Sequence, residues 1–233
     1  MCWRSAWAVA PAFTDIWALS EFTAERFRKV HRVDASVIRP IFQPEEYRVA
    51  VDGRHVTFIN PVAEKGVDRA LEIAALCPEI PFVFVRGWAL SFAAARRLQA
   101  KIDRLSNVRL VASTYDIRSI HRHTKILLAP TSSIWEETWG RVVSEAQISG
   151  IPVIASNHGA LPESVGSGGI LIDYQQPAET WAMAVRRLWT DEAYYRQMAA
   201  AAHDYSRRPD IDPNRQITLL ENSLTALLRR AAE

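Results

Sequence analysis

Short apolar runs alternate with helical patterns from about residue 54 onward. The runs are typical of buried strands and cover residues 55–59, 82–85, 108–111, 126–129, 152–155 and 169–172. Between them, apolar residues recur at helical spacing, which predicts helices over residues 66–76, 89–105, 117–121 and 141–149. Three more helical stretches follow, at residues 177–190, 191–206 and 214–232. The alternation predicts an α/β fold: a Rossmann-like parallel sheet with right-handed crossovers and helices on both faces.

The first fifty residues follow a different pattern. It predicts a strand at residues 15–20, a helix at 22–30 and a second short strand at 35–38, just before Pro40. These elements precede the alternating region.

Composition narrows the class of protein. The 233 residues are 48% hydrophobic and 23% charged, with a net charge of +2, which is ordinary for a globular protein and gives no reason to expect a nucleic-acid partner. Cys2 and Cys77 lie far apart without metal-ligand spacing, so we expect a reducing, cytoplasmic compartment. No apolar run is long enough to span a bilayer, and the amino terminus lacks the pattern of a signal peptide. Peripheral association with the inner face of the membrane stays open.

Two carboxylates stand out near the predicted helix at residue 141. Glu137 precedes that helix and Glu145 lies in its first turns, with seven residues between them. Ionised carboxylates only accept hydrogen bonds, so they suit the hydroxyl groups of a sugar or a ribose. The alternatives are a solvated helix glutamate for Glu145 and a carboxylate favoured by the helix dipole for Glu137.

The stretch from residue 135 to 155 resembles the E-x7-E signature of GT-B glycosyltransferases, in particular the GT4-like group that uses nucleotide sugars and retains anomeric configuration. The resemblance implies that Glu145 binds the ribose and that Glu137 contacts the donor sugar near the anomeric carbon. Glu136 is an adjacent carboxylate, but only Glu137 leaves seven residues before Glu145. The implied fold is the C-terminal half of a GT-B enzyme.

Lys65 follows the first predicted strand of the sheet, where a lysine can neutralise a diphosphate leaving group. It resembles the lysine of the family's Lys-Gly step, although a lone lysine is usually a solvated surface charge. The sequence departs from the family at Asn60, where many members have an arginine that grips the diphosphate. Arg86, directly after the second strand, is the candidate for the missing charge.

Further donor contacts are expected from two loops. Thr138, Trp139 and Gly140 would present backbone N–H groups at a helix start, although Gly140 suits a packing role equally well. The loop after the fifth strand resembles the family's Gly-Gly-x-Pro-Glu loop, with His158 in place of the first glycine, followed by Gly159 and Glu163. A polar loop residue without a ligand is an even alternative for His158.

The eight tryptophans are many for this length. Trp135 and Trp139 bracket the glutamates and could stack on a sugar or base, although core packing is the commoner role of the residue. Core packing is our prediction for three others, Trp88, Trp181 and Trp189. Trp3, Trp7 and Trp17 fall in the part assigned to the first domain, and some of them are expected to be partly exposed if the rest of that domain is missing.

The resemblance implies a division of the chain into residues 1–50, the end of an N-terminal acceptor domain with the interdomain connection, and residues 51–233, the nucleotide-sugar-binding domain. The leading hypothesis is a glycosyltransferase that moves a sugar from a nucleoside diphosphate to a sugar or lipid-linked acceptor, as in polysaccharide biosynthesis. No metal or other cofactor is expected. The alternative is a binding module without activity of its own, which pairs with a separate acceptor-domain chain or self-associates. A related epimerase is less favoured, and a nicotinamide dehydrogenase is disfavoured because no G-x-G-x-x-G turn follows the first strand.

Overall fold

The computed structural model describes residues 14–232, so the tryptophans at positions 3 and 7, and Cys2, lie outside the described residues. The chain forms two compact units. The sheet unit comprises residues 42–208, and the small unit comprises residues 14–41 with 209–232.

The sheet unit is built on six parallel strands in the order β5-β4-β3-β6-β7-β8. The strands are β3 (His55–Ile59), β4 (Phe82–Val85), β5 (Val108–Val111), β6 (Thr124–Ala129), β7 (Val153–Ser156) and β8 (Gly169–Ile172). The helices are α2 (Pro44–Tyr47), α3 (Val67–Leu76), α4 (Phe92–Ile102), α5 (Arg118–His121), α6 (Arg141–Gln147), α7 (Leu161–Val165), α8 (Ala178–Thr190) and α9 (Glu192–Tyr205). The predicted α/β fold with a parallel sheet is confirmed.

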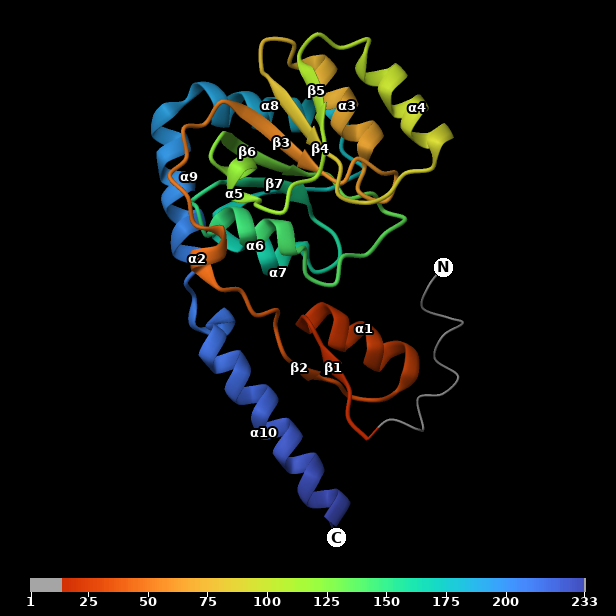
Figure 1. The fold of residues 1–233 in the computed structure, drawn as a ribbon, viewed down its shortest axis with the longest axis vertical. Coiled ribbons are helices and arrows are strands. Elements are labelled where there is room, and N and C mark those ends of the chain that lie inside the picture. Colours follow the sequence, from red (N-terminus) through yellow and green to blue (C-terminus); the bar gives the residue numbers. More distant parts are fainter. Residues whose placement is uncertain (1–13, 233) are drawn as a thin grey trace. The chain divides into compact units, whose positions relative to one another are not determined.

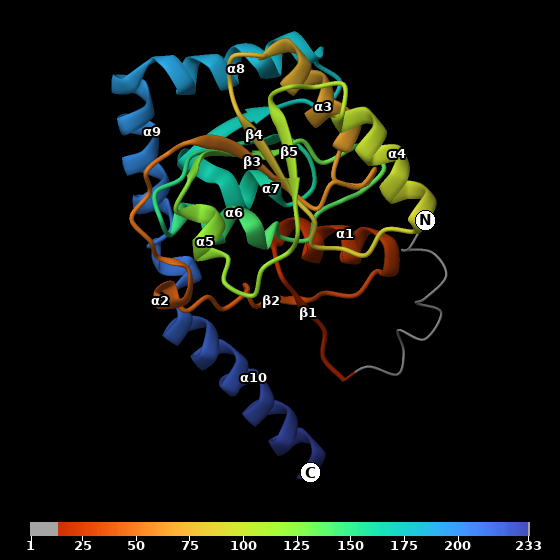
Figure 2. The same ribbon diagram turned by 45° about the horizontal axis from the view of Figure 1, so that its top comes forward.

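Helices cover both faces of the sheet, as Figures 1 and 2 show. On one face, α3, α4 and α8 bury a core whose largest members include Phe58, Phe82, Phe84 and Trp181. On the other face, α6 and α7 pack against alternate residues of β6 and β7, such as Leu127 and Val153. Strands β3, β6, β7 and β8 therefore contribute alternating side chains to two cores, which explains why they read as continuous apolar runs.

Four strands have the predicted bounds, and most predicted helices are found within a few residues of them. The fourth helix is shorter than expected because the side chain of Ser91 caps its start, accepting a hydrogen bond from the N–H of Ala94 at 3.3 Å. The short helices α2 and α7 were not predicted; each begins with a proline in its first turn.

The small unit holds β1 (Trp17–Ala18) paired in parallel with β2 (Ser36–Val37), and the helices α1 (Glu21–His31) and α10 (Pro213–Ala232). Within it, the indole of Trp17 donates to Ser223 Oγ at 2.9 Å, and the N–H of Arg39 donates to Gln216 Oε1 at 2.7 Å. Trp17 is 41% exposed.

This division differs from the predicted boundary after residue 50. Residues 42–50 belong to the sheet unit because Ser149 Oγ donates to the carbonyl of Tyr47 and accepts from the N–H of Val49, both at 3.0 Å. The last helix, α10, belongs with the N-terminal residues and not with the sheet. That the small unit is the end of an acceptor domain stays a prediction.

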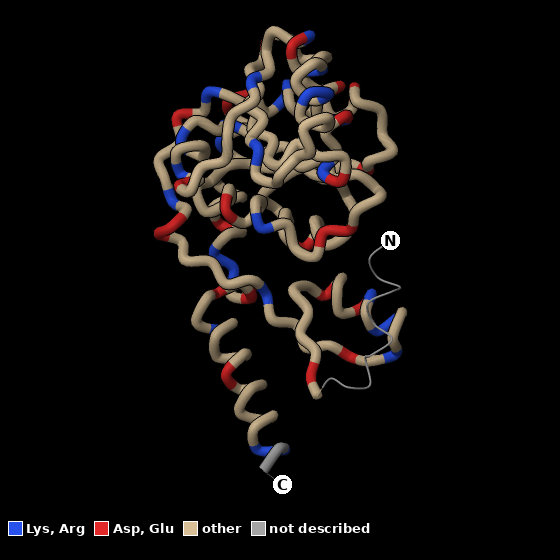
Figure 3. Tube along the Cα trace, turned by 45° about the vertical axis from the view of Figure 1, so that its right-hand side comes forward, with Lys and Arg blue, Asp and Glu red and all other residues tan. Residues whose placement is uncertain are grey.

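Positive and negative residues are interspersed along the trace of the sheet unit (Figure 3). No helix among the described residues is long and apolar enough to cross a membrane.

Candidate functional site

The candidate site lies where the chain reverses direction across the sheet. From β3 the chain continues to β4 and β5 on one side, whereas β6, β7 and β8 lie on the other. At such a switch point the loops after neighbouring strands diverge and leave a crevice at the carboxyl ends of the strands. The loop at residues 60–66 follows β3 and the loop at residues 130–140 follows β6, so both loops border this crevice.

Lys65 and Glu137, the two residues predicted to be catalytic, are in direct contact. The Nζ atom of Lys65 donates a hydrogen bond to Oε1 of Glu137 across 72 positions of sequence. Thr131 Oγ1 donates to the same oxygen at 3.4 Å. The side chains of Lys65 and Glu137 are only 16% and 13% exposed. A half-buried ion pair of this kind holds both charges in a defined place at the crevice.

The two loops are fastened to each other by backbone contacts. Both the N–H and the Oγ of Ser132 donate to the carbonyl of Glu64 at 3.1 Å. Gly66 caps the start of α3 with φ +79°, and a Cβ at this position would lie 1.8 Å from the carbonyl oxygen of Pro130. The Lys-Gly step therefore requires glycine for both its conformation and its close approach to the second loop.

Two tryptophans flank the lysine. The rings of Trp88 and Trp135 meet edge to face at 6.2 Å, and Lys65 Nζ lies 5.0 Å and 5.8 Å from their centroids. Trp88 is 45% exposed, so the prediction that it packs in the core is wrong, whereas Trp181 is fully buried and Trp189 is partly buried against the core. Trp88 lies outside the core because it follows the carboxyl end of β4, where side chains reach the crevice.

Asn60 explains the position of Trp88. It adopts a left-handed conformation with φ 61°, and its Oδ1 accepts a hydrogen bond from the N–H of Trp88 at 2.8 Å. The residue at the position of the family's arginine therefore organises the loop after β4. Arg86 has an exposed side chain that makes no ion pair with any residue from 14 to 232, and the contacts described for it do not include Lys65. Its role at a diphosphate stays a prediction.

Glu145 lies on α6 with its side chain 13% exposed, and burial raises the pKa of its carboxyl group. Arg141 opposes this shift, because its Nε lies 3.5 Å from Oε1 of Glu145. The same guanidinium donates to Tyr47 Oη at 3.2 Å and lies 4.9 Å from the ring of Phe42. Burial and the Glu145 charge raise the pKa of the Tyr47 phenol.

Tyr47 and Phe42 were not predicted to belong to this group, because they lie some 94 positions before Arg141 in a segment without a chemical motif. The one sequence feature that pointed to this group is Arg141, which lies four residues before Glu145 on the same helix and can therefore pair with it. In the described part of the chain, no hydrogen bond or ion pair joins Glu145 to Lys65 or Glu137.

The loop after β7 packs on the backbone of Glu137. Gly159 has φ +62°, and a Cβ there would lie 2.9 Å from the nitrogen of Glu137. The N–H of Ala160 donates to the carbonyl of Glu137 at 2.9 Å. His158 has a buried Nε2 atom without a hydrogen-bond partner among the described residues. Glu163 lies on α7, and its carbonyl oxygen accepts hydrogen bonds from Tyr205 and Arg208. Its backbone therefore helps to fix the helix that follows the loop.

The helix start at residues 138–140 contributes differently from the prediction. Trp139 is 1% exposed and its indole N–H donates to Ser144 Oγ at 2.9 Å, so its ring cannot stack on a ligand. This corrects the stacking role considered for Trp139, because the ring fills the core beneath the loop. Gly140 caps α6 with φ +84°, and a Cβ would lie 2.8 Å from Leu161 Cδ2. Thr138 is half-buried, and backbone contacts of this turn with a donor stay a prediction.

Among residues 14–232, no group of three His, Cys, Asp or Glu side chains is arranged to hold a metal ion. The expectation that no metal takes part stays a prediction.

Comparisons with known proteins place the chain. The family described as Glycosyl transferases group 1 matches residues 46–205, which lie within the sheet unit. A D-inositol 3-phosphate glycosyltransferase of Corynebacterium kroppenstedtii is 37% identical over 95 residues, which is 40% of this chain and 20% of that protein. A protein of the same description from Nocardioides is 37% identical over 75 residues, which is 31% of this chain and 16% of the relative.

Solved structures share the fold. Anabaena HepE in complex with UDP and glucose superposes with a TM-score of 0.82 at 20% identity, covering 93% of this chain and 65% of HepE. A glycosyltransferase from Rickettsia africae superposes with a TM-score of 0.78 at 16% identity, covering 92% of this chain and 63% of the other. The chain thus spans less than two thirds of these proteins and aligns with about a fifth of the curated relatives. Because the family match covers more than half of the chain, the protein belongs to the glycosyl transferases group 1 family.

Proposed function

We propose that this chain binds a nucleoside diphosphate sugar at the crevice between β3 and β6 and serves as the donor-binding part of a glycosyltransferase. The contact between Lys65 and Glu137 carries the proposal. It joins a cation suited to a diphosphate with a carboxylate suited to sugar hydroxyls, at the sheet edge where ligands bind in open α/β folds.

The donor enters by exchanging partners with this ion pair. A diphosphate oxygen takes the ammonium group of Lys65 from Glu137, since charged hydrogen bonds to phosphate are at least as favourable as those to carboxylate. Glu137 then has an acceptor oxygen available for a hydroxyl group of the sugar. Binding of the diphosphate and orientation of the sugar are therefore linked through a single contact.

In the transfer step, the bond between the anomeric carbon and the diphosphate oxygen breaks, and the diphosphate leaves with the electron pair. The oxygen of an acceptor hydroxyl forms the new bond to the anomeric carbon, and its proton passes to the leaving diphosphate. Lys65 stabilises the negative charge that develops on the leaving diphosphate, which is the interaction most valuable in the transition state. Retention of anomeric configuration, metal independence and a sugar or lipid-linked acceptor follow the family resemblance, and the cytoplasm is the proposed compartment.

Two other groups complete the proposed donor site. Glu145 accepts hydrogen bonds from the ribose hydroxyls, which replace the water that its buried position excludes. The unpartnered Nε2 of His158 gains a partner in the donor, since a buried polar atom without a hydrogen bond is costly. The complexes of Anabaena HepE with UDP and with UDP-glucose make uridine the first base to test.

Calorimetric titration of the chain with UDP-, GDP- and ADP-sugars tests the proposal. One nucleotide should bind in the micromolar range, and both Lys65→Ala and Glu145→Ala should weaken it at least about tenfold, as expected for loss of a charged hydrogen bond. Glu179→Ala, an exposed carboxylate at the start of α8, is the matched control and should bind as the original chain does.

Absence of binding by a folded sample, or equal binding by all three variants, would overturn the donor-site proposal. Transfer is tested separately, by adding candidate acceptors and following release of the nucleoside diphosphate. A chain that binds the donor but never releases the nucleotide with any acceptor is a binding module.

A further inference from the structure

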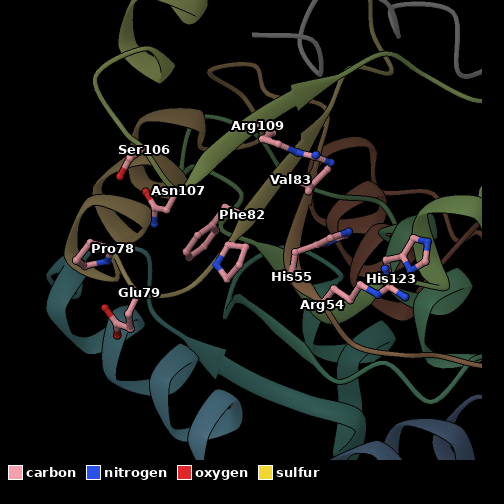
Figure 4. A pocket seen from close by; sticks show the side chains of 11 residues that line it. Arg54, His55, Pro78, Glu79, Phe82, Val83, Ser106, Asn107, Arg109 and His123 are labelled. Atoms are coloured by element: carbon pink, nitrogen blue, oxygen red, sulfur yellow. The ribbon is translucent and has the colours of Figure 1, made fainter.

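A second cavity lies at the opposite end of the sheet. It has a volume of about 550 Å³ and opens where β3, β4 and β5 begin (Figure 4). Its residue His55 starts β3, while the crevice begins beyond Ile59 at the other end of that strand, roughly 13 Å away at 3.3 Å per residue. The volume falls within the range of cavities that bind small molecules, and none of the groups already described for the donor site lines it.

Basic side chains gather on one side of this cavity. Figure 4 shows Arg109, His55, His123 and Arg54 on one side, away from Pro78 and Asn107 on the other side. Arg54 and His123 share the carboxylate of Asp52, at 2.7 Å and 2.8 Å. Arg109 is exposed and makes no ion pair with any described residue. Arg109 therefore places at the cavity a positive charge that no carboxylate of the described residues pairs with.

Glu79 is the carboxylate in the lining of the cavity, and it does not neutralise the charge of Arg109. Glu79 is held by Arg186, whose Nε lies 2.8 Å from Oε1, and this contact lowers the pKa of the Glu79 carboxyl group. Its charge is thus neutralised by a cation on α8.

The hydrogen-bond direction at His55 can be worked out from its neighbours. Thr124 Oγ1 donates to the carbonyl of Ile120 at 2.9 Å, so it can only accept from Thr57 Oγ1, 2.7 Å away. Thr57 has then used its proton, and the contact of 3.1 Å to His55 Nδ1 requires an N–H on that ring nitrogen. His55 Nε2 has no partner in the described part of the chain. It is an acceptor in the neutral ring and becomes a donor only when the ring is protonated.

Without a ligand, the surroundings oppose that protonation. Burial, the largest cause, and the charges of His123 and Arg109 together lower the pKa of His55 to about 4, although Asp52 opposes the shift. An anion bound between these cations would reverse the balance, since it favours the charged imidazole and supplies an acceptor for Nε2.

Apolar groups line the rest of the cavity. Pro78, Pro81 and Val83 contribute carbon surface beside the cations, and Val83 is the register neighbour of Arg109 on the adjacent strand. A bare inorganic ion would leave this surface in contact with water. A ligand with both an anionic group and a carbon skeleton uses both parts.

We propose that this cavity is a second ligand site, which binds a small organic phosphate with its phosphate group between Arg54, His55 and Arg109 and its carbon skeleton against Pro78 and Pro81. The site lies at the other end of the strands from the donor crevice, so its occupancy can be measured whether the donor site is occupied or empty.

The test is an NMR titration with phenyl phosphate, inorganic phosphate and phenol, followed through the ring signals of His55. It is run on a Lys65→Ala background so that phosphate binding at the crevice does not interfere. Phenyl phosphate should shift the His55 signals and raise the pKa of His55 from about 4, and it should bind more tightly than either smaller probe. Arg109→Ala should weaken binding at least about tenfold, the effect of losing one charged hydrogen bond.

Arg104→Ala, an exposed arginine just beyond α4 and outside the cavity, is the matched control and should leave the affinity unchanged. No shift of His55 at millimolar phenyl phosphate would overturn the proposal. Equal binding of phenol would show that the cations are not used, and equal binding by Arg109→Ala and Arg104→Ala would remove the assigned phosphate site. Each of these results is independent of whether the crevice binds a nucleotide sugar.

Discussion

Gly66 offers a sharp test of how the two loops of the donor site are held. Its φ of +79° is a conformation that costs an alanine about 1 kcal/mol. In addition, the Cβ of Gly66→Ala would lie 1.8 Å from the carbonyl oxygen of Pro130, and ordinary contact begins at 3.4 Å. One loop must therefore retreat by about 1.6 Å. Since the obstacle is backbone, we expect a further 1–3 kcal/mol of destabilisation, as for other overpacked sites.

The displacement acts on the predicted catalytic residues directly. Gly66 adjoins Lys65, and Pro130 begins the loop that carries Glu137, so the shift separates the two members of the ion pair. Calorimetry should show affinity for the nucleotide sugar reduced at least about tenfold, and chemical unfolding should show the loss of stability.

Gly53→Ala is the matched control. Gly53 has a similar φ of +61°, but a Cβ there meets its nearest atom, Lys125 Cβ, at 3.5 Å. It should lose only the conformational cost of about 1 kcal/mol and bind the donor normally. If Gly66→Ala and Gly53→Ala behave alike in both assays, the close approach of the two loops is not what organises the site.

Three further predictions concern buried groups. Burial lowers the pKa of His121 to about 4, so the unfolded chain takes up a proton near pH 6.5 that the folded chain does not. This group should cost up to about 3 kcal/mol of stability between pH 6.5 and 4, and His121→Leu should remove that share in urea unfolding, while the share of His55 stays. A parallel pH profile in the variant would contradict it. Because burial raises the pKa of Glu145, Glu145→Gln should be more stable than wild type at neutral pH, with the gain shrinking as the pH falls towards 4.5; a pH-independent difference would argue against this reading. Trp139→Phe should lose about 1–3 kcal/mol by orphaning Ser144 Oγ, with donor affinity unchanged in calorimetry; weakened binding at unchanged stability would place the indole in the site.

The sequence alone predicts the sheet because each buried strand leaves a short apolar run between polar loops. Strand β3 was predicted at its observed bounds, since a run such as Val56 to Ile59 between polar loops has few other ways to bury itself. The position of Lys65 after one strand and Glu137 after another also follows from sequence, because parallel strands bring their carboxyl ends to one edge. The seven-residue spacing to Glu145 carried the family resemblance, and the match over residues 46–205 agrees with it.

Contacts between distant loops were decided only by the tertiary structure. Composition favoured a buried Trp88, but Asn60 holds it at the crevice through a hydrogen bond across 28 positions. Trp139 and Trp135 are near neighbours in sequence, yet one fills the core and the other flanks Lys65. Hydrophobicity does not distinguish them, because burial of a loop residue depends on the path of the backbone and on which elements pack beneath it. The hydrogen bond between Arg141 and Tyr47 also depends on strand order and loop conformation, which no local pattern encodes. The same holds for the arginines that lie around His55.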